Sequence, residues 1–289
     1  MNIKLFLNKI YWAIVKKSNA QNNKKSYATW SEKGYNPTPE ISFIIQSHNK
    51  SLQVKHIVGK LRECRDAEII VIDDGSERQH TQSLAKFLNR ANEFLIRSGD
   101  LYEVIMYDKA IRFCNGRYIC LLQDDDDFDT LEWVEQALGC FRKYPLLAIL
   151  GGNNGQQVTL LPGGEMMLQS VTDTDKPFVP AMYVDRAPMW IARSHYMERL
   201  KHIDQSFAPF QFDDCELCLR AWLSGLWAGW YPAHFKSLSA GGMRIWNSAF
   251  TGEQCQRNGI KLYQRYASKQ EAIEKMVKKA TDELNEQRT

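Results

Sequence analysis

The sequence lacks the glycine-rich signatures of two large classes of phosphate-binding loop. Neither GxxxxGK followed by Ser or Thr, nor GxGxxG, occurs in its 289 residues. A glycine-rich backbone cradle is therefore excluded, and any bound phosphate has to be held by side chains or by a metal ion.

Cysteines and long apolar runs are also scarce. The seven cysteines are odd in number and scattered, which favours a reducing compartment. Cys215 and Cys218 form a lone CxxC with no second half-site, which argues against zinc. No run reaches the ~20 apolar residues of a transmembrane helix, and the first residues lack a small-residue cleavage site. These absences predict a soluble, cytoplasmic body.

Positive charge is concentrated at the N-terminus. Residues 1–33 carry seven Lys and one Glu, so their net charge is +6. The whole chain has a net charge of +3, so the remaining residues carry −3. Apolar residues recur at helical spacing among these lysines, at Ile3, Phe6 or Leu7, Ile10 and Ile14. We expect residues 1–39 to form a basic amphipathic helix followed by a polar linker, which begins at residue 18. The helix either lies on an anionic membrane, at its inner face, or packs on the protein or a partner.

From residue 40 the pattern alternates between buried strands and amphipathic helices. Apolar runs predict strands at residues 41–46, 68–73, 118–123 and 146–152, with helices between them. This order predicts an α/β fold with a mostly parallel sheet flanked by helices. Residues 151–180 lack periodicity and are interpreted as a loop. Residues 251–289 are interpreted as a C-terminal helical tail that packs on the body.

Polar clusters follow three of the predicted strands. They are Gln46 to Asn49, Asp73 to Ser76, and Gln123 to Asp127 with its four consecutive aspartates. One such cluster alone is more often a polar turn. Three at the carboxyl ends of neighbouring parallel strands would form one wall of a ligand crevice. Because adjacent carboxylates repel unless solvated or held by a hard cation, a nucleotide diphosphate with Mn²⁺ or Mg²⁺ fits this wall.

The ordered segments SFIIQSHNK, EIIVIDDGS and GRYICLLQDDDDF resemble the nucleotide-sugar-binding half of glycosyltransferase family 2, which has the GT-A (Rossmann-like) fold. FDDCELCLRAWLSGLWAGW, at residues 212–230, resembles the stretch of that family that carries the catalytic base. The resemblance covers about residues 40–240. It implies one GT-A domain over residues 40–250, with a nucleotide-sugar half at 40–130 and an acceptor half at 131–250.

The resemblance also implies donor-side roles. Asp74 matches the carboxylate that reads the base or ribose, and Asp125 matches the second, metal-binding Asp of a DxD motif. Gln123 replaces the first Asp of the motif. Because four aspartates are consecutive, the motif can be aligned one residue later, which makes Asp126 a second metal candidate. The resemblance separately implies His234 as a third. We expect nucleotide contacts from Gln46, Asn49, Asp73, Asp74, Arg97 and Asp124.

The base is the remaining requirement. A sugar hydroxyl is a poor nucleophile at neutral pH, so a carboxylate must take its proton as it attacks C1. The resemblance assigns this role to Asp214, with Asp213 beside it, in an inverting reaction. A helix cap is the alternative for both residues. Weaker candidates for the acceptor or diphosphate are Glu216, Arg220, Arg244 and Trp190.

The sequence thus predicts a metal-dependent glycosyltransferase. It would move a sugar from a nucleotide diphosphate, with UDP favoured, to a saccharide or lipid-linked saccharide. A catalytically inactive binding or scaffold protein with this fold is one alternative. A sugar nucleotidyltransferase is another, although that class normally shows a glycine-rich phosphate loop near the first strand.

Overall fold

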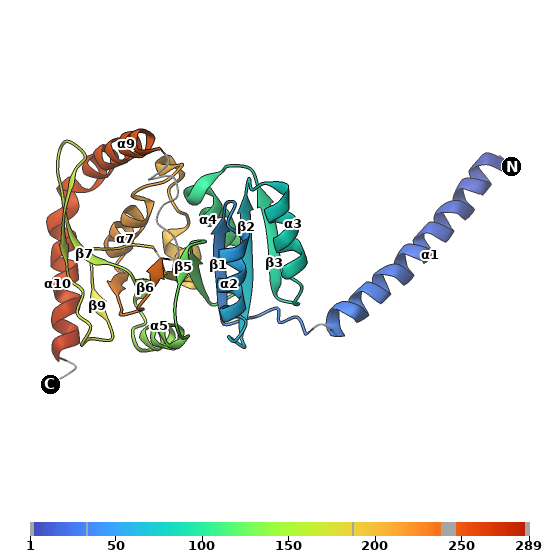
Figure 1. Cartoon of the computed structure of the whole chain (residues 1–289), viewed down its shortest axis with the longest axis horizontal. Coiled ribbons are helices and arrows are strands. Elements are labelled where there is room, and N and C mark those ends of the chain that lie inside the picture. The colour runs from blue at the N-terminus through green and yellow to red at the C-terminus, as the bar shows by residue number, and fades with distance from the viewer. Residues whose placement is uncertain (1–2, 33, 187, 238–246, 287–289) are drawn as a thin grey trace.

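The structure is a computed structural model that describes residues 3–32, 34–186, 188–237 and 247–286. Its body (Figure 1) is built on an eight-stranded sheet. The strand order of this sheet is β3-β2-β1-β4-β11-β6-β12-β9. The neighbours β3, β2, β1 and β4 are parallel to one another, whereas β11 and β9 run antiparallel to their partners. The predicted mostly parallel α/β sheet is therefore confirmed. Its strands are β1 (Ile41–Ser47), β2 (Ala67–Asp74), β3 (Glu93–Ser98), β4 (Tyr118–Leu122), β6 (Leu147–Gly151), β9 (Val179–Pro180), β11 (Met189–Ala192) and β12 (Trp227–Trp230).

Helices cover both faces of the sheet because its strands are apolar on both sides. In β1, Phe43 and Ile45 belong to one hydrophobic cluster and Ile44 to the other, as the alternation of a strand requires. The first cluster includes side chains of α2 (Ser51–Leu61), α3 (Arg78–Phe87) and α5 (Glu132–Lys143). The second includes side chains of α4 (Tyr102–Phe113), α7 (Asp213–Leu223), α9 (Ser248–Tyr266) and α10 (Gln270–Glu286). The predicted C-terminal tail therefore packs into the body.

The described residues also form several short elements. The helical ones are α6 (Arg193–His195), a π-helix (Tyr196–Leu200) and two 3₁₀ helices (Gln205–Phe207 and Ala267–Lys269). One small sheet consists of β10 (Tyr183–Val184), β7 (Gly155–Leu160) and β8 (Met166–Ser170). A second consists of β13 (Lys236–Ser237) and β5 (Asp126–Asp127). The expectation of a loop over residues 151–180 was wrong, since β7 and β8 form a hairpin there. Its glycine- and glutamine-rich composition hides the apolar alternation of Val158 and Leu160, which are buried. At Gly164 the turn approaches α9 so closely that a Cβ on Gly259 would overlap the Gly164 carbonyl.

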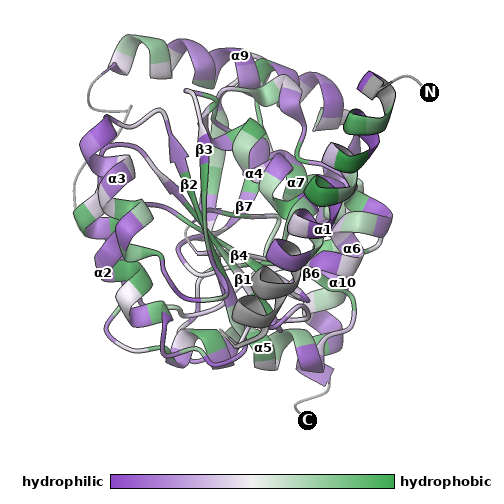
Figure 2. Ribbon diagram, turned by 90° about the vertical axis from the view of Figure 1, so that its right-hand side faces the viewer, coloured by the Kyte–Doolittle hydropathy of each residue, from purple (hydrophilic) through white to green (hydrophobic). Residues whose placement is uncertain are grey.

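The N-terminal helix α1 (Ile3–Glu32) extends away from the body as one continuous rod (Figure 1). Residues 18–32, expected to be a linker, are helical, and this stretch contains neither Gly nor Pro to end the helix. Hydrophobic residues concentrate in its N-terminal half (Figure 2). Large side chains there are exposed, including Phe6, Ile10 and Trp12, so packing on the protein's own surface is not observed. Within the described ranges, no helix combines the length and apolar character needed to cross a bilayer.

Candidate functional site

The three polar clusters lie next to one another because β1 pairs with both β2 and β4. Ser47 is opposite Asp73, and Ile45 is opposite Leu122, the residue that ends β4. Parallel strands present their carboxyl ends at one edge of a sheet, and this edge is where ligands bind in open α/β folds. Asp124 lies two residues after Leu122, so the acidic run begins at this edge.

Asp124 and Asp125 converge on one positive charge. Asp124 accepts hydrogen bonds from the His48 backbone N–H at 2.9 Å and from Lys50 Nζ at 3.0 Å. Asp125 lies 3.9 Å from the same ammonium and accepts a hydrogen bond from Ser237 Oγ at 3.2 Å. Burial raises the pKa of Asp124, while the His48 hydrogen bond and the Lys50 charge oppose the rise. The two carboxylates are thus arranged around the ammonium group of Lys50. The sequence analysis did not predict a role for Lys50.

The last two aspartates of the run turn elsewhere. Asp126 is buried, and its Oδ2 accepts the Gln123 backbone N–H at 2.8 Å. Burial raises the Asp126 pKa well above its usual range. Asp127 faces α2, where it accepts hydrogen bonds from Lys60 Nζ at 2.6 Å and His56 Nε2 at 3.0 Å. Burial raises its pKa, but the hydrogen bonds from Lys60 and His56 outweigh that effect and leave it lowered.

The carboxylate oxygens of Asp124 and Asp125 are the kind of ligand that a hard divalent cation prefers. The described residues contain no group of three or more His, Cys, Asp or Glu side chains placed to hold a metal. Mg²⁺-type sites, however, commonly use one or two carboxylates together with substrate phosphates and water. The convergence of Asp124 and Asp125 fits that pattern. His234, a predicted ligand, is exposed and lies two residues before β13.

The two aspartates that end β2 have different partners. Both oxygens of Asp74 are engaged: Oδ1 accepts from Ser98 Oγ at 2.8 Å and the Leu101 N–H at 2.9 Å, and Oδ2 accepts from the Tyr102 N–H at 2.9 Å. Asp74 therefore holds the start of α4. In Asp73, Oδ2 accepts from Thr81 Oγ1 at 2.5 Å, whereas the buried Oδ1 has no hydrogen-bond partner among the described residues. Asp74, the residue expected to read the base or ribose, is thus engaged by groups of the protein, whereas Asp73 keeps one carboxylate oxygen without a partner among the described residues.

The other predicted nucleotide contacts also differ in how far the protein itself engages or buries them. Asn49 has φ 58°, and its Oδ1 accepts the Glu77 N–H at 2.8 Å, so it ties the two neighbouring loops together. Gln46 is partly buried on β1, opposite Ile72. Arg97 is exposed on β3, in register with Asp73 at the same sheet edge.

The second acidic cluster opens α7. Asp213 is buried and accepts a hydrogen bond from Arg186, whose other nitrogen donates to Glu103 of α4 at 2.6 Å. Asp214 is partly exposed. Its Oδ2 accepts from the Tyr183 hydroxyl at 3.4 Å and its Oδ1 from the Cys215 N–H at 2.9 Å. Neither Asp caps the helix, since the N-cap is Phe212 without a side-chain hydrogen bond.

One buried aromatic ring lies between the two acidic clusters. The Tyr107 hydroxyl donates to the Leu122 carbonyl at 2.8 Å, and the Arg186 guanidinium lies 4.9 Å from the ring centre. Burial raises the Tyr107 pKa well above its usual range; Arg186 opposes the rise, and nearby carboxylates, including Asp124, add to it. Sequence reasoning missed Arg186 and Tyr107. The available signal for Arg186 was a pair of charged residues, Asp185 and Arg186, in the otherwise apolar stretch VDRAPMWIA.

Several weaker predictions are corrected by burial and pairing. Trp190 is fully buried and donates its indole N–H to the Tyr231 hydroxyl at 2.8 Å, so it has no exposed face for a sugar. Glu216 and Arg220 pair at 2.8 Å. Arg220 also donates to the carbonyls of Leu200 and His202, so this pair fastens α7 to its neighbours instead of facing an acceptor. Arg244 lies outside the described residues.

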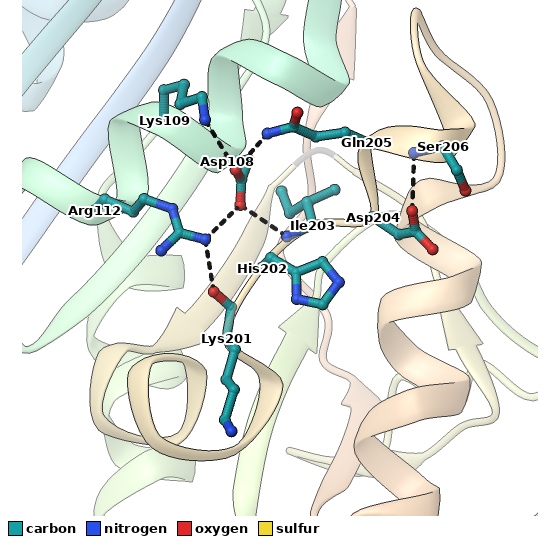
Figure 3. A pocket seen from close by; sticks show the side chains of 9 residues that line it. All are labelled: Asp108, Lys109, Arg112, Lys201, His202, Ile203, Asp204, Gln205 and Ser206. Atoms are coloured by element: carbon teal, nitrogen blue, oxygen red, sulfur yellow. Dashed lines mark hydrogen bonds and ion pairs between the residues drawn. The ribbon is translucent and has the colours of Figure 1, made fainter.

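Two surface cavities lie away from the strand ends. One, of about 560 Å³, is formed by the second half of α4 and residues 201–206 (Figure 3). The other, of about 590 Å³, lies beside Phe212 and is lined mainly by the β7–β8 turn and α9. The second cavity is therefore next to the start of α7.

Comparison with known proteins gives one family and a consistent fold. The family model described as glycosyl transferase family 2 matches residues 42–221. No curated protein sequence matches the chain. The solved structures that resemble it share little sequence, so the likeness shows the fold alone.

Three of these solved structures are glycosyltransferases of the GT-A fold. The mannosyltransferase PcManGT from Pyrobaculum calidifontis, in complex with GDP-Man and Mn²⁺, is 11% identical with a TM-score of 0.53, over 79% of this chain and 69% of that one. GalNAc-T7 with UDP, GalNAc and Mn²⁺ is 13% identical with a TM-score of 0.55, over 68% of this chain and 43% of that one. S. aureus TarS 1–349 in complex with UDP-GlcNAc is 14% identical with a TM-score of 0.53, over 72% of this chain and 61% of that one.

Proposed function

The chain belongs to glycosyl transferase family 2, and on this premise we propose that it is a metal-dependent, inverting glycosyltransferase. Its donor is a nucleoside diphosphate sugar bound at the carboxyl ends of β1, β2 and β4. Asp125 holds the metal together with Asp124, and Asp214 is the base. The observation that carries the proposal is the convergence of Asp124 and Asp125 on the Lys50 ammonium.

The donor side is supported by the polar groups that the fold leaves unsatisfied. Asp73 Oδ1 and Ser47 Oγ are both buried without a hydrogen-bond partner in the described part of the chain, on residues paired across β1 and β2. Leaving buried polar atoms unpaired costs about 1–3 kcal/mol each. A ligand that donates from its base or ribose would satisfy the Asp73 carboxylate, so this residue takes the role that the family resemblance assigns to Asp74.

The metal is Mn²⁺ or Mg²⁺. PcManGT and GalNAc-T7 both contain Mn²⁺ in the structures that resemble this one. When bound, the cation would offset the charge of the departing diphosphate. Lys50 lies where the two carboxylates meet, so it either moves aside for the metal or shares the diphosphate charge with it.

We favour Asp214 as the base because the neighbouring Asp213 is already paired with Arg186. Asp213 is buried against Arg186, whereas Asp214 is partly exposed at the start of α7. Hydrogen bonds from Tyr183 and the Cys215 N–H orient its carboxylate. Asp214 takes the proton of the acceptor hydroxyl as that oxygen attacks C1, and the bond from C1 to the diphosphate breaks on the opposite side.

The acceptor is a saccharide or a lipid-linked saccharide. The cavity beside Phe212 supports this assignment because it adjoins the start of α7 and includes Met166 and Leu168 in its lining. The proposal also places α1 on the anionic inner face of a membrane. Its exposed Phe6, Ile10 and Trp12 would insert while its lysines contact lipid headgroups.

A thermal-shift panel tests the donor site. UDP, dTDP, GDP and CDP are each added with and without Mn²⁺, and the expected result is that one nucleotide raises Tm only when the metal is present. At about 100 times its Kd a ligand adds about 2.7 kcal/mol of stability, which is readily measured. A shift without metal would give the cation's role to Lys50. No shift with any nucleotide would favour the binding or scaffold protein.

A further inference from the structure

The segment that leads into α7 has an unusual backbone. Residues 204–212 begin with a 3₁₀ helix (Gln205–Phe207) and end with two consecutive non-glycine residues at positive φ, Gln211 at 81° and Phe212 at 66°. Such conformations are costly for residues with a side chain and persist when the surroundings hold them. Asp213 and Asp214 follow at once, so whatever holds this segment also sets the position of the proposed base.

Asn258 of α9 holds the segment from one side. Its side chain is fully buried, and Nδ2 lies within hydrogen-bonding distance of three carbonyl oxygens: those of Phe207 at 2.9 Å, Phe210 at 3.0 Å and Gln211 at 2.9 Å. An amide offers two N–H donors, so these carbonyls share them. The carbonyls of Phe207 and Phe210 are buried, so losing this donor would be costly for them. A single side chain thus fixes both ends of the turn before α7.

Other side chains of α9 hold the earlier part of the segment. Arg257 donates to the Ala208 carbonyl and Lys261 to the Ser206 carbonyl. Arg265 pairs with Asp204 and donates to Ser206 Oγ at 3.1 Å. Asn258 is the member of this row that reaches Gln211, the residue nearest to α7.

The opposite side of the segment is held by α4. Asp108 is buried and accepts the Ile203 N–H at 3.0 Å and Gln205 Nε2 at 2.9 Å (Figure 3). Nearer to α7, the Pro209 carbonyl accepts the Val104 N–H at 3.3 Å, in the first turn of α4. That turn is the one held by Asp74 at the strand ends. The segment therefore touches the donor half on one side and leads to the base on the other.

We propose that Asn258 is a positioning residue for sugar transfer. It fixes the turn at residues 207–211 and, through it, the distance of the Asp214 carboxylate from the donor. The inference rests on the proposed function of Asp214, and it assigns a role to α9, which lies beyond the family-matched residues 42–221.

The first test compares Asn258→Ser with Arg265→Gln in the full chain. Asn258→Ser shortens the side chain and removes its reach, whereas Arg265→Gln alters only the start of the segment. The readout is release of UDP from UDP-glucose and UDP-N-acetylglucosamine, or of GDP from GDP-mannose, with Mn²⁺. Nucleotide Kd and binding stoichiometry are measured by calorimetry on the same samples.

We expect Asn258→Ser to lower kcat by about 10²-fold, the cost of misplacing a catalytic group by about 1 Å. The nucleotide Kd and stoichiometry should stay at the wild-type values, and Arg265→Gln should keep its kcat. A merely structural role would instead reduce binding stoichiometry and activity together. Wild-type kcat in Asn258→Ser, or a parallel loss of nucleotide binding, would overturn the proposal.

Hydrogen exchange provides a second test that needs no turnover. In Asn258→Ser, amides of residues 207–216 should exchange faster, while those of β1 and α10 keep wild-type protection. Asn258→Asp, which replaces the donor with a carboxylate, should show the same pattern more strongly. Unchanged exchange at residues 207–216 would refute the positioning role. If the wild type binds no nucleotide but this exchange pattern appears, the proposed function fails while the positioning of α7 stands.

Discussion

The guanidinium of Arg186 lies 4.9 Å from the centre of the Tyr107 ring, and this contact joins the two acidic parts of the site. Tyr107 donates a hydrogen bond to the carbonyl of Leu122, two residues before the aspartate run begins. Arg186 is paired with Glu103 and with Asp213, beside the proposed base. The donor and base halves therefore share a buried, charged connection, and disturbing it should affect both.

Replacing Arg186 should destabilise the fold. Arg186→Met removes the guanidinium that pairs with the buried Asp213 carboxylate, and removing one member of a buried ion pair costs about 3–5 kcal/mol. Urea denaturation measures the free energy of unfolding. The double variant Arg186→Met with Asp213→Asn should regain part of the loss, because it no longer buries the unpaired Asp213 charge. A single-variant loss no greater than that of a surface substitution would contradict this account.

Two aspartates of the run should differ in their effect on nucleotide binding. Asp125→Ala is expected to abolish Mn²⁺-dependent binding of the nucleotide identified by the thermal-shift panel. Asp127→Asn is the matched control, because Asp127 faces Lys60 and His56 on α2. It should keep wild-type affinity and lose about 1 kcal/mol of stability with its partly exposed ion pair. Calorimetry with equal affinity for Asp125→Ala and wild type would remove the metal from this residue.

The base can be separated from the donor site. Asp214→Asn should keep the nucleotide Kd and lower turnover by about 10²–10⁴-fold, the usual contribution of a general base. Turnover is followed as nucleotide diphosphate released from the sugar donor. Near-wild-type turnover would place the base on another carboxylate.

Asp204 should make stability depend on pH in acid. Burial raises its pKa, but hydrogen bonds from Ser206 and Arg265 outweigh this and lower it to about 2 from 3.8. The folded state therefore binds this proton less readily than the unfolded state. The stabilisation is present above pH ~4 and is lost as the pH falls towards 2. The shift corresponds to at most about 2.4 kcal/mol, which screening at this partly exposed pair reduces to about 1.

The check compares wild type with Asp204→Asn in urea at pH 6 and pH 3. The variant should be less stable at pH 6, and the difference should shrink at pH 3. A difference that grows on acidification would mean that the pKa of Asp204 is raised in the folded state.

Removing residues 1–17 should release the protein from anionic vesicles without changing nucleotide binding. The measurement is co-sedimentation with vesicles containing phosphatidylserine, compared with purely zwitterionic ones. Trp12→Ser, which removes one exposed aromatic ring, should weaken sedimentation at every salt concentration, whereas exchange of Lys16 and Lys17 for Gln should matter most at low salt. Equal sedimentation of the truncated protein would rule out the membrane role of α1.

Sequence patterns were sufficient for the strands that form the crevice. The runs before Gln46, Asp73 and Gln123 are mostly apolar because those strands are buried on both faces, and such runs can be recognised in the sequence alone. The polar clusters at their ends could be located for the same reason, because they begin where the apolar runs stop.

The connecting residues were not predictable, because their partners are distant in the chain. Arg186 and Glu103 are 83 residues apart, and Asn258 reaches the Phe207 carbonyl across 51 residues. Which of Asp73 and Asp74 is available to a nucleotide depends on which carboxylate accepts the backbone N–H groups at the start of α4. The length of α1 was underestimated because the polar residues 18–32, which contain neither Gly nor Pro, were included in the predicted linker.

The place of β12 in the sheet has a practical consequence for fragments of this protein. β12 lies between β6 and β9, yet it follows the family-matched residues 42–221. A fragment cut at that boundary would retain Asp125 and Asp214 but expose the unpaired edge of β6. Open strand edges promote aggregation. Recombinant versions should therefore run through α9 and α10, because a fragment designed on sequence similarity alone would precipitate before its chemistry could be measured.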